Sequence, residues 1–382
     1  MVIQQSKYVA TAIALSAATL TVSTLTTAGP GHPASGAPVP ARCTVAGVVA
    51  TWSPTRLARQ TIVVPVPETS VGDVSAEVAN GVGGVILFGS SAPLDLGTKL
   101  RHLLSTAPQG IAPVVMTDEE GGAVQRMANL VGSMPSARQM AASMTPTQVH
   151  ALAQRVGAKM RQADVTMNLA PVLDLDNRPG PSATNPDGTR SFSINPVTAQ
   201  TYGLAFANGM RAAGVVPAVK HFPGLGGATG NTDLSPAWTL PWSTLETHGL
   251  RPFVGAINAG EPAVMVTTAR VPGLTSLPAA LSSHVVGREL RRRLGFTGLV
   301  MTDSLSGGAV SGAGYSVQSA AVRALKVGAD MVLFNAPPRQ VATITASIVQ
   351  AVVSAVRDGD LPIARLRHAA VHVLTAKRAP VC

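Results

Sequence analysis

Short apolar runs alternate with longer segments of helical periodicity along most of the chain. The short runs are rich in Val, Ile, Leu and Met, which is typical of strands that are buried on both faces of a sheet. They cover residues 61–66, 84–88, 113–116, 167–172, 215–219, 263–266, 298–301 and 331–334. Segments such as 147–161, 196–213 and 341–356 lie between them and have the length and periodicity of helices.

Buried strands joined by crossover helices predict parallel pairing and an α/β fold. Eight such units over roughly 300 residues favour a single-domain (β/α)8 TIM-type barrel. A doubly wound open sheet is the alternative. The sequence shows no short repeat and no second domain, so we expect residues 43–382 to form the one barrel.

The first 28 residues have the layout of a cleavable signal peptide. Lys7 is the only charged residue, and the apolar run after it ends at Ala28. Interspersed Ser and Thr residues weaken this run as a membrane anchor, so we expect no stable membrane span after cleavage. Residues 29–42 are rich in Pro and Gly and predict a flexible spacer. The mature protein is therefore expected outside the cell or in the cell envelope.

Composition agrees with an ordinary globular protein, because 46% of the 382 residues are hydrophobic and 13% are charged. The two cysteines, Cys43 and Cys382, exclude a disulfide-rich scaffold, and no His/Cys spacing indicates a zinc site. We therefore expect no metal and no cofactor. After export the two cysteines would lie in an oxidising compartment, where either one disulfide between the chain ends or two free thiols are compatible with the sequence.

The net charge of +10 does not by itself predict a nucleic-acid partner. Basic residues cluster only at Arg291, Arg292 and Arg293, without interleaved aromatic residues or a binding motif. A solvated helix face is the favoured interpretation, and attraction to an anionic envelope agrees with the charge. We expect a monomer, although the sequence does not establish the oligomeric state.

Polar residues directly follow several of the predicted strands, where a barrel gathers its catalytic side chains. They are Asp118, Asp174, Asp176, Lys220, His221 and Asp303. Carboxylates there can act as nucleophile, acid or base, while Lys, His and Arg donate hydrogen bonds to a neutral ligand rich in hydroxyls, such as a sugar. Phosphate chemistry is disfavoured, because the chain has no phosphate-binding loop and residues 224–227 lack a dinucleotide fingerprint.

Four motifs in order resemble glycoside hydrolase family 3, in its single-domain β-N-acetylglucosaminidase branch. They are Asp-Glu-Glu-Gly-Gly-Ala-Val-Gln-Arg at 118–126, Arg-Ser-Phe at 190–192, Lys-His-Phe-Pro-Gly at 220–224 and Thr-Asp-Ser-Leu at 302–305. The resemblance spans almost the whole mature chain. It implies a retaining β-glycosidase that releases terminal N-acetylglucosamine from cell-wall fragments such as muropeptides.

The resemblance also assigns roles to individual residues. Asp303 matches the nucleophile, which would form a covalent glycosyl-enzyme. The positions that match substrate-binding residues are Asp118, Arg126, Arg190, Lys220 and His221. We expect nearby cations to keep Asp303 ionised.

The acid/base region departs from the branch pattern, which has Lys-His-Phe-Pro-Gly-His-Gly followed by Asp-Ser-His. Here Leu225 replaces the second histidine, Asn231 the dyad Asp, and Asp233 the catalytic His, while Thr267 and Thr268 occupy positions after the sixth strand where a histidine is common. Asp233 could supply the acid if a closing loop at 226–230 raised its pKa; a solvated, uninvolved Asp233 is the alternative.

Three functions follow from this pattern. The first is an exported retaining β-N-acetylglucosaminidase. The second is a sugar-binding protein of the same fold that has lost catalytic power with its acid/base residue. The third is a glycosidase or transglycosidase of altered specificity, because the changed loop borders the sugar.

Overall fold

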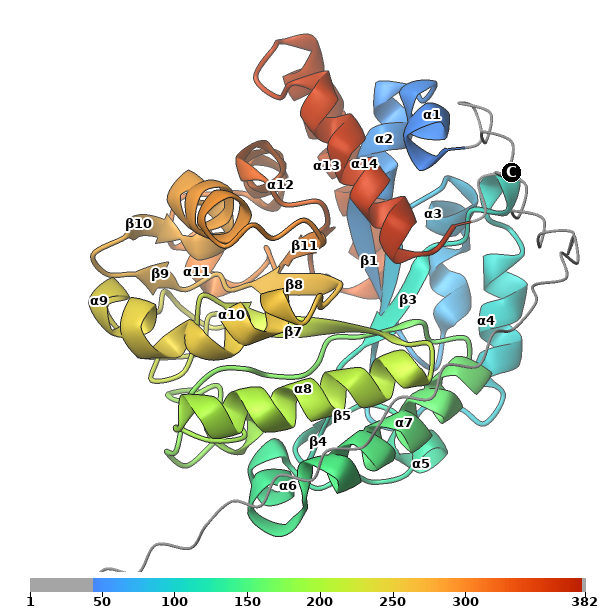
Figure 1. Ribbon diagram of the computed structural model, residues 1–382. Coiled ribbons are helices and arrows are strands. Elements are labelled where there is room, and N and C mark those ends of the chain that lie inside the picture. The colour runs from blue at the N-terminus through green and yellow to red at the C-terminus, as the bar shows by residue number, and fades with distance from the viewer. Residues whose placement is uncertain (1–43, 380–382) are drawn as a thin grey trace, which may run out of the picture. The chain divides into compact units, whose positions relative to one another are not determined.

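The computed structural model describes residues 44–379, which form a ring of parallel strands with helices packed around the outside (Figure 1). Residues 1–28 and 29–42, predicted as signal peptide and spacer, lie outside the described residues. Cys43 and Cys382 also lie outside them, so their disulfide stays a prediction.

Eight strands make up the ring, in the order β11, β8, β7, β6, β3, β2, β1, β12, and neighbours pair in parallel. A parallel bridge between Met301 and Met331 joins β11 to β12 and closes the ring. The bounds are β1 Ile62–Pro67, β2 Gly84–Phe88, β3 Val114–Thr117, β6 Met167–Asn168, β7 Val216–Phe222, β8 Ala263–Val266, β11 Leu299–Thr302 and β12 Val332–Leu333. The predicted (β/α)8 barrel is confirmed, and the alternative of an open sheet is wrong.

Each of the eight predicted apolar runs overlaps one strand, and two strands differ clearly in length from the prediction. β6 ends at Asn168, well before the predicted end at 172, and Pro171 beyond it has no N–H to donate to a ladder. β7 continues to Phe222, three residues past its predicted end. The extension places Lys220 and His221 inside a strand, where the backbone fixes their direction.

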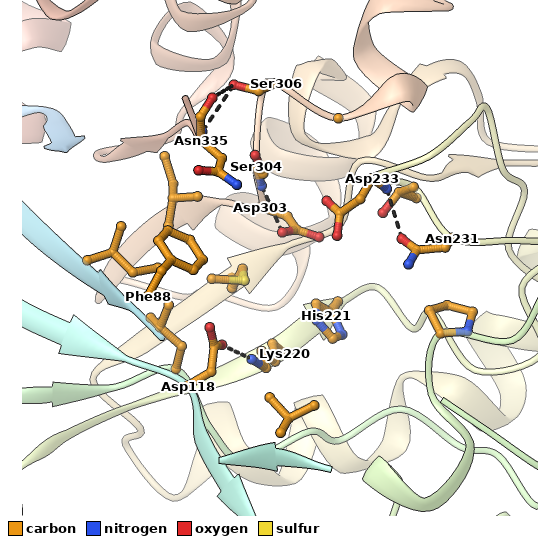
Figure 2. Close-up of a pocket in the computed structure, with 18 of the residues that line it drawn as sticks. Phe88, Asp118, Lys220, His221, Asn231, Asp233, Asp303, Ser304, Ser306 and Asn335 are labelled. Carbon is orange, nitrogen blue, oxygen red and sulfur yellow. Dashed lines mark hydrogen bonds and ion pairs between the residues drawn. The ribbon is translucent and has the colours of Figure 1, made fainter. Parts of the chain in front are cut away.

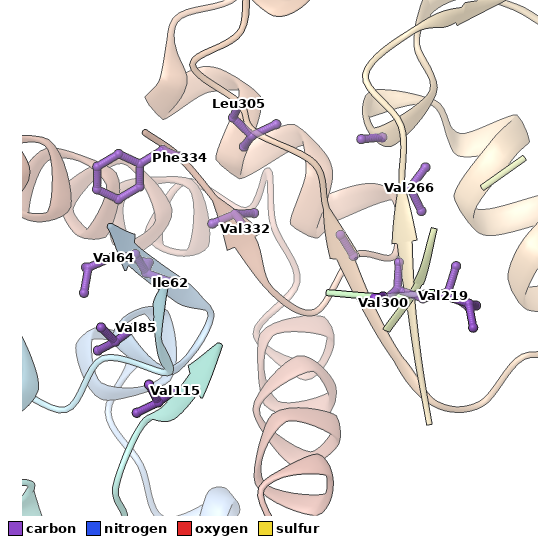
Figure 3. Close-up of a cluster of buried hydrophobic side chains, with 14 of the residues drawn as sticks. Ile62, Val64, Val85, Val115, Val219, Val266, Val300, Leu305, Val332 and Phe334 are labelled. Atoms are coloured by element: carbon purple, nitrogen blue, oxygen red, sulfur yellow. The ribbon is translucent and has the colours of Figure 1, made fainter. Parts of the chain in front are cut away.

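The alternation of side chains along the strands divides the core into two layers. One layer fills the barrel and includes Met116, Met167, Met265, Met301 and Met331. The other lies between strands and helices; Figure 3 shows part of it. Its labelled members include Ile62, Val64, Val85, Val332 and Phe334. Full burial of such a side chain stabilises the fold by about 1.5–3 kcal/mol, so these layers hold the strand ends in place.

Helices surround the ring and begin where the local sequence supplies caps. The hydroxyl of Thr145 accepts a bond from the backbone of Gln148, and Pro146 occupies the first helical turn of α7. The helices are α1 Val45–Ala50, α2 Pro54–Gln60, α3 Ser75–Ala79, α4 Leu96–Leu104, α5 Ala128–Val131, α6 Ala137–Ser143, α7 Pro146–Gln162, α8 Pro196–Ala212, α9 Trp242–Thr244, α10 Arg251–Asn258, α11 Gly308–Ser311, α12 Val317–Val327, α13 Pro338–Arg357 and α14 Ile363–Ala376. A π-helix spans Ser283–Arg293.

Two small hairpins pair β4 (Glu119–Gly121) with β5 (Val124–Gln125), and β9 (Arg270–Val271) with β10 (Thr275–Pro278).

The arginine cluster on the π-helix differs in part from the prediction of a solvated face. Arg292 and Arg293 are exposed. Arg291 turns inward instead, and its guanidinium lies 2.5 Å from the buried carboxylate of Asp330. A buried carboxylate needs such a partner, so Arg291 stabilises the barrel.

Helix α13 is the one described helix with the length and apolar composition of a membrane span. In the barrel it packs against α2, α12 and β1, and Val341, Ile348 and Val352 are buried there. Its apolar face therefore has a partner within the fold.

Candidate active site

A cavity of about 940 Å³ opens at the carboxyl ends of the barrel strands (Figure 2). This is the end at which barrel enzymes carry out their chemistry. The cavity is lined by seven candidates of the sequence analysis, whereas Asp174 and Asp176, predicted on the same rim, do not line it. The seven are Asp118, Arg126, Arg190, Lys220, His221, Asp233 and Asp303. The volume is in the range that accommodates a small ligand such as one or two sugar rings.

Asp303 follows β11 directly. Its backbone N–H donates to the carbonyl of Val266 on β8 (2.9 Å), and its Oδ1 accepts a bond from the N–H of Ser304 (2.7 Å). Figure 2 shows the carboxylates of Asp303 and Asp233 pointing toward one another. Burial raises the pKa of Asp303, and the charge of Asp233 raises it further, while Lys220 lowers it. Lys220 thus favours the ionised form of Asp303, in the direction expected of a nearby cation, while burial and Asp233 oppose it.

Asp233 lies on a loop that hydrogen bonds hold against the start of α11. Its carbonyl accepts from the N–H of Gly308 (2.9 Å), and the carbonyl of Thr232 accepts from Ala309 (3.0 Å). The side chain of Asn231 accepts from the N–H of Asp233 (2.9 Å). The protein packed around the carboxyl raises its pKa, and Asp118 adds to the increase, although the residue itself is exposed at the cavity mouth, where solvent weakens both effects.

A buried network of charges forms the floor of the cavity. The ammonium of Lys220 lies 2.6 Å from Asp118 and 2.7 Å from Glu120. Glu120 also accepts two parallel bonds of 2.8 Å from the guanidinium of Arg190. Burial alone would raise the pKa of Glu120, but Arg190 and Lys220 hold it well below its usual range. Each charge in the network is thereby paired.

Glu120 is a site residue that the sequence analysis did not select. It lies within the quoted 118–126 motif, two residues after Asp118, and its own side chain is 3% exposed. The sequence does not reveal that the short hairpin strand β4 is buried, because a run such as Asp-Glu-Glu is normally exposed to solvent. Three consecutive carboxylates at a strand end were the available signal.

Replacement of Glu120 by Gln should destabilise the protein strongly. The change leaves Lys220 and Arg190 buried without their shared carboxylate, a loss worth about 3–5 kcal/mol. Urea denaturation measures the free energy of unfolding. In the matched control, Asp95→Asn, an exposed pair with Lys99 is broken, and the cost should stay below about 1 kcal/mol. Equal costs for the two variants would contradict this account of the network.

His221 is held by Asp174, whose carboxylate lies 2.6 Å from the imidazole Nδ1. Asp174 also accepts from the N–H of Leu225 at 2.7 Å. Burial lowers the pKa of His221 to about 4, so the ring is neutral near pH 7. Asp176, the other carboxylate predicted on this rim, instead pairs with Arg178 at 2.9 Å.

Arg126 lies at the side of the cavity. Its Nη1 donates a long bond of 3.5 Å to the carbonyl of Gly89, and its Nε has no hydrogen-bond partner within residues 44–379. Arg126 lines the cavity, so its guanidinium is placed to meet a ligand there.

Two of the positions that depart from the branch pattern, Leu225 and Thr267, make packing contacts and hydrogen bonds around Ala269. Leu225 packs with Ala228 and Ala269, and the hydroxyl of Thr267 accepts from the N–H of Ala269 (3.1 Å). A Cβ at Gly226 would lie 2.1 Å from the carbonyl of Leu175, so only glycine fits there. The loop is thus closely packed in this structure, and its movement as a lid stays a prediction.

Comparison with known proteins assigns the class of this barrel. Residues 67–376 match the family model described as glycosyl hydrolase family 3 N terminal domain. The chain therefore belongs to glycosyl hydrolase family 3, as its four motifs predicted.

Individual relatives agree with this assignment. The chain is 36% identical to the beta-hexosaminidase LpqI of Mycobacterium tuberculosis over 93% of this chain and 90% of that protein. The solved structure of LpqI covers 89% of this chain and 98% of its own, with a TM-score of 0.80 at 34% identity. A beta-N-acetylhexosaminidase from Beutenbergia cavernae covers 86% and 100%, with a TM-score of 0.78 at 33% identity. An uncharacterized secreted glycosyl hydrolase from Arthroderma benhamiae is 33% identical over 76% of this chain and 83% of its own.

Proposed function

We propose that the protein is an exported, retaining β-N-acetylglucosaminidase in which Asp303 is the nucleophile and Asp233 the acid/base. The observation that carries the proposal is the pair of carboxylates facing one another over a sugar-sized cavity (Figure 2). Relatives named as hexosaminidases support the choice of sugar. The roles of the individual residues rest on their geometry and on the motifs that they occupy.

The reaction begins when Asp303 attacks the anomeric carbon while protonated Asp233 donates its proton to the leaving oxygen. The C–O bond to the aglycone breaks, and the sugar is held covalently on Asp303. Asp233, now a carboxylate, takes a proton from water, which attacks the same carbon and releases the sugar with its configuration retained. The raised pKa of Asp233 favours the protonated form that the first step needs.

The charged floor of the cavity binds the sugar hydroxyls. Asp118 accepts hydrogen bonds, Lys220 and Arg190 donate them, and the buried Glu120 keeps both cations in place. Charge-assisted bonds are stronger than neutral ones and fix the ring relative to Asp303. Neutral His221 adds a donor or an acceptor, and Arg126 closes the site at its side.

Wall fragments that carry terminal N-acetylglucosamine are the proposed substrates. The predicted signal peptide at 1–28 and the relative named as a secreted glycosyl hydrolase support export. The positive net charge would attract an anionic envelope.

The proposal is tested with 4-nitrophenyl glycosides of N-acetylglucosamine and glucose, together with N-acetylglucosamine-terminated muropeptides. We expect kcat/KM to favour the N-acetylated sugar and muropeptides to release N-acetylglucosamine. Preference for glucose would indicate altered specificity. Binding of N-acetylglucosamine without turnover of any substrate would favour the sugar-binding protein, for which the replaced dyad at Leu225 and Asn231 is the supporting observation.

Replacement of Gly308 by Ala should move Asp233 and impair acid catalysis selectively. The new Cβ would lie 2.4 Å from the carbonyl oxygen of Leu234, so the loop must shift. We expect the rate with a poor leaving group such as 4-methoxyphenol to fall about tenfold or more, while dinitrophenol, which needs little protonation, leaves nearly as fast as from wild type.

The matched control is Gly72→Ala, because a Cβ at Gly72 would meet no atom within 4 Å. Its rates with both substrates should equal those of wild type. A uniform loss with both leaving groups in Gly308→Ala would contradict the assignment of acid catalysis to this loop.

A further inference from the structure

Three buried side chains beside the sugar cavity form a cluster of potential metal ligands, in which Asp174 lies 2.6 Å from Nδ1 of His221. One ligand atom each from Asp174, Asp187 and His221 lie within 4.8 Å of one another. The three residues are 0%, 0% and 4% exposed. They come from separate segments, since Asp174 follows β6, His221 lies in β7, and Asp187 lies between β6 and α8.

Asp187 supplies the second observation that points to a ligand. Both of its carboxylate oxygens are buried and lack a hydrogen-bond partner within residues 44–379. A buried polar group without a partner costs about 1–3 kcal/mol, and more if it is charged. The side chain is nevertheless aimed at Asp174, another carboxylate, rather than at a donor of the protein.

Contacts on both sides fix the backbone around Asp187. A Cβ at Gly188, where φ is +52°, would lie 2.1 Å from the carbonyl carbon of Gly180. Arg138 donates to the carbonyl of Gly188 (2.6 Å), and Arg190 donates to the carbonyl of Pro186 (2.9 Å). The backbone of Asp187 is thus held between two fixed residues, which supports a preorganised position for its Cα.

We propose that Asp174, Asp187 and His221 bind a divalent zinc ion. One imidazole nitrogen with two carboxylate oxygens is a donor set that suits zinc, and three protein ligands leave a fourth position for water. The double positive charge would balance the two adjacent carboxylates, and His221 is the only one of the three that lines the sugar cavity, which gives the ion an entry path.

A consequence for turnover depends on the proposed function. Zinc would occupy a ring nitrogen of His221, a side chain that we assign to sugar binding. We therefore expect zinc to inhibit by raising KM for the aryl N-acetylglucosaminide, whereas the binding of zinc itself does not depend on that assignment.

The test is a titration of the chelator-treated protein with ZnCl₂ against a chromophoric chelator. Wild type should bind one equivalent that Asp187→Asn binds at least about 100-fold more weakly. The matched control is Glu261→Gln, which alters another buried carboxylate with an unpartnered oxygen, and it should bind like wild type. No tight zinc in wild type, or equal affinity in Asp187→Asn, would overturn the proposal and leave a buried water as the partner of Asp187.

X-ray absorption at the zinc edge of the wild-type complex keeps the test decisive if Asp187→Asn does not fold. We expect nitrogen and oxygen ligands that include one imidazole. Sulfur scattering would place zinc on Cys43 or Cys382 and contradict the site. Zinc that binds as expected in a protein without glycosidase activity would uphold this proposal and reject the proposed function.

Discussion

Asp303→Asn should abolish turnover of aryl β-N-acetylglucosaminides, with kcat reduced on the order of 10⁴-fold or more. The amide cannot form the glycosyl-enzyme, so even a dinitrophenyl leaving group should give no rescue. The variant should not lose stability, because burial and Asp233 both oppose the charge of Asp303 in the native state. Stopped-flow release of dinitrophenol and urea denaturation measure the two effects.

Sugar binding is the control for this variant. Calorimetric titration with N-acetylglucosamine should give an affinity close to that of wild type, since the charged floor around Lys220 and Glu120 is unchanged. Turnover by Asp303→Asn at more than a few per cent of the wild-type rate would exclude Asp303 as the nucleophile.

Asp233→Asn should reduce turnover according to the leaving group. Loss of a positioned general acid costs about 10²–10⁴-fold, and the loss should be greatest for natural glycosides and 4-methoxyphenyl compounds. Dinitrophenol leaves without help, so the first step should stay fast while hydrolysis of the glycosyl-enzyme slows. Rates across a series of phenols give the dependence on leaving-group pKa, which should steepen in the variant.

The pH profile provides a separate test of Asp233. Turnover requires deprotonated Asp303 and protonated Asp233, so the wild-type rate should fall as pH rises through the pKa of Asp233. The raised pKa of this carboxyl moves the fall to a higher pH than an ordinary aspartate would give. The two carboxyls titrate together, so the limbs of the profile belong to the pair. Asp233→Asn should lose the alkaline limb; an unchanged limb would assign the acid to another group.

The sequence predicted the barrel well because its strands are buried on both faces. Continuous apolar runs such as 84–88 and 263–266 coincide with β2 and β8, and the helices predicted at 147–161 and 196–213 agree with α7 and α8 to within one residue at each end. The length of β7 was underestimated. The polar pair Lys220 and His221 ends the apolar pattern, but the backbone pairing with β8 continues beyond it.

The site could be predicted only as far as strand ends reveal it. Seven of the candidates share one cavity, while Asp174 and Asp176 do not line it, and the partners that orient them all are set by tertiary packing. Glu120 was missed because an acidic run looks solvated, and Arg291 looked solvated although it pairs with Asp330. Asp187 gave no signal, because a metal ligand set spread over 48 residues, from Asp174 to His221, has no sequence spacing to recognise.

The most direct test of the central claim is intact-mass analysis of Asp233→Asn quenched during reaction with dinitrophenyl β-N-acetylglucosaminide, followed by peptide mapping. The activated leaving group lets the first step proceed without an acid, and the missing base delays hydrolysis, so the glycosyl-enzyme should accumulate. The account predicts one N-acetylhexosaminyl unit per chain, attached to the peptide that contains Asp303. An adduct on another residue, or no adduct although the sugar binds, would contradict it.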